Sequence, residues 1–138
     1  MLLGLTDSVH AIRFTAIPLV ARLLDQLSLG TVQKFLDHII ELFNRQEVET
    51  WEVAEGLLNA LGLLVKRMMP EAGHTHGSPT GMSSDTFEYH VLPRIKGLVY
   101  NLFDYEHPSV RSGAVQLLLT CLKRCQRTVS CDPHVIFI

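Results

Sequence analysis

The sequence carries little charge and contains no long apolar run. Charged residues make up 19% of the 138 positions and the formal net charge is −2, so nucleic-acid binding, which favours a basic face, has no support. The longest apolar candidate, residues 57–65, is interrupted by Asn59 and followed by Lys66-Arg67. It falls well short of the roughly 20 residues of a membrane-spanning helix, so we expect no membrane insertion.

Cysteine is scarce too. The chain has three, Cys121, Cys125 and Cys131, an odd number crowded near one end. Cys121 and Cys125 are four residues apart in a helical pattern, which favours small apolar core groups over a metal site. The opening residues MLLGLTDS are short and lack the basic start of a secretory signal. These features predict an intracellular protein, most naturally in the reducing cytoplasm.

The motifs of catalysis and cofactor binding are missing. Neither GxGxxG nor GxxxxGK[ST] occurs, so nothing favours a phosphate cradle. Cys125 or Cys131 with His134 is arithmetically a nucleophile–base pair, but that segment offers no oxyanion framework. His74 and His76, in GHTHG, have no fixed third and fourth ligands for a metal. We therefore predict no enzyme, no cofactor and no metal site.

What the sequence does contain is a repeated phrase. SVRSGAVQLLLTCL (109–122) aligns with AIRFTAIPLVARLL (11–24) at an offset of 98 residues, matching an arginine and most apolar positions. A weaker copy, EVAEGLLNALGLLV (52–65), keeps the apolar positions but has Ala54 where the other copies have arginine. Self-similarity of this kind is the signature of a repeat architecture.

A second phrase precedes the first. VQKFLDHIIELFN (32–44) aligns with LPRIKGLVYNLFD (92–104) at an offset of 60 residues, and residues 2–7 read as the tail of a third copy. Successive copies of the first phrase are 41 and 57 residues apart, and the longer gap holds a segment rich in Gly, Pro, Ser and Thr at 70–85. Without that loop the period returns to about 40 residues, the length of a two-helix repeat.

Apolar residues spaced i, i+3, i+4 and i+7 predict amphipathic helices at 8–28, 31–45, 49–69, 86–104 and 108–127. We expect Thr31 and Asp85 to cap the second and fourth of these helices and Pro108 to lie in the first turn of the fifth. Pro18 and Pro93 lie inside helices and should kink them.

Glycines also fall within the predicted helices, where each lowers helix propensity by about 1 kcal/mol against alanine. We expect close helix approach to explain them. They are Gly56, Gly62, Gly97 and Gly113.

At these phrases the chain resembles the HEAT/armadillo family of helical repeats. HPSVRSGAVQLL and VHAIRFTAIPLV resemble the second helix of a HEAT repeat, and TDSVHAIR and FDYEHPSVR resemble its helix–turn–helix junction. The resemblance covers most of residues 1–127 and implies an all-α fold, an α-solenoid of antiparallel helix pairs with about two and a half repeats. Residues 128–138 are expected to be a poorly ordered tail. Because about three repeats are needed for stability, we expect further repeats in a longer chain.

The resemblance also implies roles for four charged residues. In HEAT-like repeats a turn aspartate and a helix arginine form a ladder between neighbouring repeats, and the second helices line the concave face. The matching residues here are Asp7, Arg13, Asp104 and Arg111. The middle repeat has Asn44 and Ala54 at these places, so the ladder is expected to be broken there.

The function that these features favour is a non-catalytic scaffold for protein–protein interaction, holding a partner protein that the sequence does not identify. Side chains expected to face outward are candidate partner contacts; the alternatives are simple solvation or, for the tryptophan, burial at a repeat junction. The candidates are Arg22, Asp25, Trp51, Lys66, Lys123 and Arg124.

Two further hypotheses stay open. The carboxylates at the start of the third helix either match its dipole or contact a basic partner; they are Glu47, Glu49, Glu52 and Glu55. A tubulin-binding HEAT array of the TOG type is the alternative function, since such arrays bind through the turns between paired helices. Trp51 and Arg45 fit that alternative, whereas the acidic residues do not.

The segment rich in His, Ser and Gly at 73–85 has a hypothesis of its own. Ser78-Pro79 and the neighbouring hydroxyl groups favour a phosphorylation target in an exposed segment.

Overall fold

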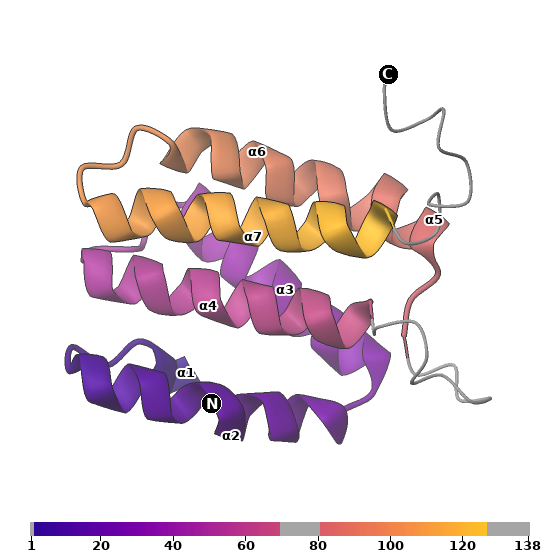
Figure 1. Cartoon of the computed structure of the whole chain (residues 1–138), viewed down its shortest axis with the longest axis horizontal. Coiled ribbons are helices and arrows are strands. Elements are labelled where there is room, and N and C mark those ends of the chain that lie inside the picture. The colour runs from indigo at the N-terminus through magenta and orange to yellow at the C-terminus, as the bar shows by residue number, and fades with distance from the viewer. Residues whose placement is uncertain (1, 70–80, 127–138) are drawn as a thin grey trace.

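The computed structural model describes residues 2–69 and 81–126, and these residues are all-helical (Figure 1). This confirms the predicted all-α class. The elements are, in chain order, α1 (Leu2–Leu5), α2 (His10–Asp25), α3 (Leu29–Asn44), α4 (Trp51–Met68), α5 (Ser84–Thr86), the π-helical turn η1 (Phe87–Val91), α6 (Leu92–Leu102) and α7 (Pro108–Gln126).

Some of the predictions fall on residues that the structure does not describe. They are the tail at 128–138, residues 70–80 of the loop at 70–85 with His74, His76 and Ser78-Pro79, the pair Cys131 and His134, and the side chain of Cys125.

The described helices form two layers. The helices α2, α4 and α7 run side by side in the same direction, with α4 packed on both neighbours (Figure 1). The second layer contains α3 and α6, which contact each other and run in the opposite direction; in Figure 1 α3 lies behind α4 and α7, and α6 lies beside α7. All three turns that lead into α2, α4 and α7 therefore lie at one edge of the molecule, which we call the turn edge (residues 6–9, 45–50 and 103–107).

The core lies between the layers, and α4 is its centre. Nine of the 18 residues of α4 are buried, because the helix packs against α2, α3 and α7 and also against α1. Its sequence is rich in Leu, Ala and Val on all sides but one, the pattern of a helix with neighbours on several faces. In α3 and α6 the buried residues keep to one face, including Val32, Leu36 and Ile39 on α3 and Ile95 and Val99 on α6.

The caps differ from the prediction. Ser28, not Thr31, caps α3, because the Ser28 backbone is extended and its hydroxyl accepts the Thr31 N–H at 3.3 Å. Likewise Ser83, not Asp85, caps α5, accepting the N–H of Thr86 at 3.2 Å. Both predicted caps were wrong because an earlier serine competes for the same place. Pro108 begins α7, as predicted.

The two prolines behave differently. The missing N–H of Pro93 cannot complete an α-helical bond, and the chain takes the π-helical turn η1 just before it, with the Leu92 N–H donating to the carbonyl of Phe87. At the place of the kink predicted for Pro93, the structure thus has a π-helical turn, which is wider than an α-helical one. In contrast, α2 continues through Pro18, and the kink predicted there stays a prediction.

Close approach explains two of the four helical glycines. A Cβ atom on Gly56 would lie 2.0 Å from the carbonyl oxygen of Leu5, so α1 rests directly on the backbone of α4. A Cβ atom on Gly113 would lie 3.3 Å from the Leu58 side chain. Gly62 and Gly97 have nothing within 4 Å of that position, so for them the expectation was wrong.

Candidate functional site

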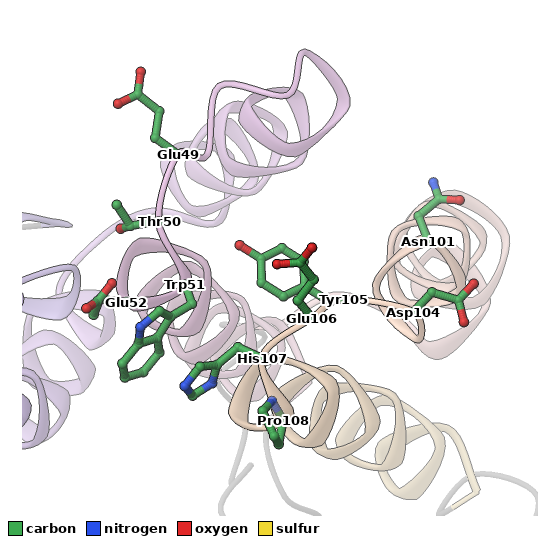
Figure 2. Close-up of a pocket in the computed structure, with 10 residues that line it drawn as sticks. All are labelled: Glu49, Thr50, Trp51, Glu52, Asn101, Asp104, Tyr105, Glu106, His107 and Pro108. Carbon is green, nitrogen blue, oxygen red and sulfur yellow. The ribbon is translucent and has the colours of Figure 1, made fainter.

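A cleft of about 860 Å³ opens at the turn edge, between the turn from α3 to α4 and the turn from α6 to α7 (Figure 2). The layered packing of α4 against α7 brings the two turns together, although they lie more than fifty residues apart in the chain. We call this space the turn-edge cleft. Its lining residues are Glu49, Thr50, Trp51, Glu52, Asn101, Asp104, Tyr105, Glu106, His107 and Pro108.

Two stacked rings join the two turns. The rings of Trp51 and His107 lie 3.9 Å apart at the centroids and 3° from parallel. Trp51 is held because Thr50 caps α4, accepting the N–H of Val53 at 3.3 Å. His107 is held by Ser109, whose N–H donates to Nδ1 at 3.2 Å, so the neutral imidazole carries its hydrogen on Nε2. Stacked rings of this kind give the cleft a rigid aromatic wall.

A buried arginine supports the wall from the α2 side. Arg13 is 2% exposed, and its guanidinium carbon lies 5.5 Å from the centre of the Trp51 ring. Its Nη1 donates to the carbonyls of Asp7 at 2.8 Å and Ser8 at 3.0 Å, and its Nη2 lies 3.4 Å from the Glu55 carboxylate. The side chain therefore ties the turn before α2 to the first two turns of α4.

Arg111 repeats part of this arrangement in α7. Its Nη1 donates to the carbonyls of Tyr105 at 2.7 Å and Glu106 at 3.1 Å, which precede it by six and five residues, as Asp7 and Ser8 precede Arg13. The recurrence in the sequence thus corresponds to a recurrent contact in the structure.

Arg13 contacts the backbone carbonyl of Asp7, and the side chains of the two aspartates that the resemblance assigns to the ladder have other surroundings. The Asp7 carboxylate accepts the Val9 N–H at 2.8 Å, and the ion pair of Arg13 is with Glu55. Asp104 is exposed at the rim of the cleft. A ladder that links whole repeats stays a prediction.

The charge of the turn-edge cleft is one-sided. Four carboxylates line it, those of Glu49, Glu52, Asp104 and Glu106, and among the described residues that line it none is Lys or Arg. The N-termini of α4 and α7 point to this edge, and their positive dipole ends offset part of the repulsion between the carboxylates. A concave surface lined by one sign of charge concentrates its field and attracts the opposite charge.

The predicted partner contacts are separated by the structure. Trp51 belongs to the turn-edge cleft, whereas the other five lie in the second halves of α2, α4 and α7, toward the opposite edge. Lys66 also lines a shallow groove of about 420 Å³ over α2, α4 and α7. Of the five, Arg22, Asp25, Lys66 and Lys123 are exposed, and Arg124 is half-buried.

Sequence reasoning missed the α6–α7 half of the cleft. Tyr105, Glu106 and His107 were read only as part of a repeat junction. The repeat alignment contained a signal for this half of the cleft, because it makes the turn at 103–107 equivalent to the turn at 45–50, next to Trp51. Arg67 was missed as well. Its Nε and Nη2 donate to the carbonyls of Leu24 at 2.9 Å and Leu27 at 2.7 Å, closing the end of α2.

Comparisons with protein-family models, with curated proteins and with solved structures give no match for this chain. Within the part of the chain that the structure describes, no three His, Cys, Asp or Glu side chains gather to hold a metal ion. None of the helices in residues 2–69 and 81–126 is long and apolar enough to cross a membrane.

Proposed function

We propose that the chain is a non-catalytic protein-binding module, built as a HEAT/armadillo-type α-solenoid, and that its turn-edge cleft takes a basic segment of a partner protein. The repeat architecture is supported by the recurring phrases, by the parallel placement of α2, α4 and α7, and by the matching carbonyl contacts of Arg13 and Arg111. In this architecture the proposed module acts by presenting a fixed surface.

The observation that carries the proposal is the combination of carboxylates and rings in one cleft. Glu49, Glu52, Asp104 and Glu106 surround a cleft whose wall contains Tyr105 and the Trp51–His107 stack. A partner lysine or arginine would exchange water for carboxylate oxygens, while its aliphatic stem would lie against the rings. The guanidinium of arginine also packs favourably on aromatic faces, which favours an arginine-containing segment.

The alternative, a TOG-like array that binds tubulin, is supported only by location. The cleft lies at the turns between paired helices, where such arrays bind. The basic residue expected for that role, Arg45, is paired with Glu41 and does not line the cleft. The acidic lining favours the basic-segment proposal.

The test is calorimetric titration of the whole chain with a short peptide rich in Arg and Lys, and with the same peptide in which Glu replaces the basic residues. We expect saturable binding of the basic peptide only, weakening as salt rises because part of the attraction is screened. Charge reversal at Glu49→Lys with Glu106→Lys should weaken binding at least tenfold.

The matched control is charge reversal at two exposed acids outside the cleft, Asp25→Lys with Glu88→Lys. It makes the same change in net charge and should leave most of the affinity. Equal loss in both double variants would show that only net charge matters, and the cleft would then not be the binding site.

A further inference from the structure

The exposed apolar side chains of this protein gather at its two ends. Figure 1 shows α2, α4 and α7 stacked in order, so one side of α2 and one side of α6 and α7 are the ends of the stack. Among the described residues ten large apolar side chains are exposed, and eight of them belong to these ends; the other two are Phe14 and Tyr89. Concentration of apolar surface in patches marks sites of association.

The first patch is a stripe along α2, which we call the leading face. It consists of Val9, Ile12, Leu19 and Leu23. Their spacing of three, seven and four residues places them on one side of the helix. Ile12, Leu19 and Leu23 are 46%, 56% and 48% exposed, although the side of α2 that meets α4, with Val20 and Leu24, is buried.

The residues of α7 that are equivalent to this stripe indicate what kind of surface the stripe fits. At the offset of 98 residues, Ile12, Leu19 and Leu23 correspond to three residues of α7. These are Val110, Leu117 and Cys121, which are 0%, 3% and 0% exposed because α7 packs on α4 and α6. The equivalent positions are thus buried in α7, which packs on α4 before it in its layer and on α6, and are exposed in α2, which has no preceding helix of its layer among the described residues.

The second patch, the trailing face, lies at the other end of the stack. It consists of Tyr100 on α6, Phe103 directly after α6, and Val115 and Leu119 on α7. Phe103 is nine residues from Arg94, half a turn away on a regular helix, and Arg94 pairs with Asp37 of α3. The trailing face of α6 is therefore turned away from α3.

In the repeat alignment, the side of α7 that carries Val115 and Leu119 is equivalent to the side of α4 that packs against α7. In α4 that side includes Leu58, which a Cβ on Gly113 would touch at 3.3 Å. Leu58 is one repeat, 57 residues, before Val115. Leu58 is buried, whereas Val115 is exposed.

We propose that a second copy of this chain docks head to tail, placing its leading face on the trailing face of the first. The chain itself carries both halves of the contact that α4 and α7 make internally, so one copy supplies what the other lacks. Arg111 lies at this end in the place that Arg13 occupies in α2. Arg13 pairs with Glu55 of the next helix in its layer, and the repeat aligns Glu55 with Phe14. Arg111 of one copy would therefore face the exposed ring of Phe14 in the docked copy.

A head-to-tail contact of this kind adds copies in series, because each added copy exposes a new trailing face; the series ends only where the rotation between copies closes a ring. The proposal is independent of basic-partner binding, since the turn-edge cleft shares no residue with either face.

The experiment is sedimentation equilibrium of the whole chain. We expect the average mass to rise steadily, past that of a dimer, over about a hundredfold range of concentration, because association follows mass action. A monomer throughout this range would overturn the proposal, and so would a stable dimer that grows no further.

Two variants make the test directional. Leu19→Asp removes the leading face and Val115→Asp the trailing face, and both sites are exposed, so circular dichroism should report an intact fold. Each variant alone should be monomeric. An equimolar mixture should form a dimer and nothing larger, because only one intact pair of faces remains.

The control is Tyr89→Asp on η1, an exposed aromatic site that belongs to neither face, which should retain assembly with at most a severalfold loss. Failure of the mixture to dimerise would contradict head-to-tail docking, as would assembly of Leu19→Asp on its own. If either aspartate variant unfolds, Leu23→Lys and Leu119→Lys repeat the test at the same faces.

Discussion

At the scale of single residues, Arg13 has the most demanding environment in the described chain. It is charged and 2% exposed, and its Nε has no hydrogen-bond partner. Burial of a charge is unfavourable unless partners replace the lost water. Here two carbonyls and the Glu55 carboxylate do so, and the Trp51 ring covers the guanidinium. The shape of the cleft wall therefore depends on a residue that lies outside the cleft.

We predict that Arg13→Met lowers the free energy of unfolding by about 3 kcal/mol, because it leaves Glu55 and two carbonyls without their partner. Urea denaturation followed by circular dichroism measures the change. Arg22→Met on the exposed side of the same helix is the control and should stay within about 0.5 kcal/mol of the parent chain. Similar losses in the two variants would mean that the buried contacts contribute little.

At the scale of elements, periodicity predicted the helices well, because the spacing of apolar residues reflects which face is buried. The observed α2, α3, α4 and α7 lie within a few residues of the predicted bounds. The caps were wrong because Ser28 and Thr31 have similar chemistry, and only the backbone conformation decides between them.

The candidate site was harder to predict than the helices. Trp51 was identified from its residue type, but its partner His107 comes from a distant turn. Only the packing of α4 on α7 brings the two residues together. Apolar periodicity predicts where helices occur, but it does not predict which helices contact each other. The charged candidates at the ends of α2, α4 and α7 were chosen by exposure alone, and exposure does not place residues at one site.

The approach of α1 to α4 gives a prediction at this scale. Gly56→Ala should lower the free energy of unfolding by about 2 kcal/mol, because the new Cβ would lie 2.0 Å from the Leu5 carbonyl oxygen and α1 must move. Gly62→Ala, in the same helix but with nothing within 4 Å, is the control and should gain up to about 1 kcal/mol.

Thermal or urea unfolding of the two glycine variants measures the difference. A stabilising effect in both would show that α1 is loosely attached to α4, contrary to the contact described here.

At the scale of the whole molecule, parallel alignment of α2, α4 and α7 separates charge. Their N-terminal ends meet the acidic turn edge, and their last turns carry the basic residues Arg22, Lys66, Arg67, Lys123 and Arg124. At each edge this charge is the one that the dipoles of α2, α4 and α7 favour, whereas α3 and α6 run in the opposite direction. For the partner that we propose, this asymmetry would favour one orientation, with basic groups drawn to the cleft and acidic groups to the opposite edge.

We propose that the cleft, and not the overall charge of the chain, selects a basic segment. The most direct test is to follow backbone and indole N–H signals by NMR while the Arg- and Lys-rich peptide is added to the whole chain. We predict the largest shifts at residues 49–52 and 101–108, with the indole signal of Trp51, the only tryptophan in the chain, among them. Shifts spread evenly over acidic residues, or gathered at the opposite edge, would contradict the account.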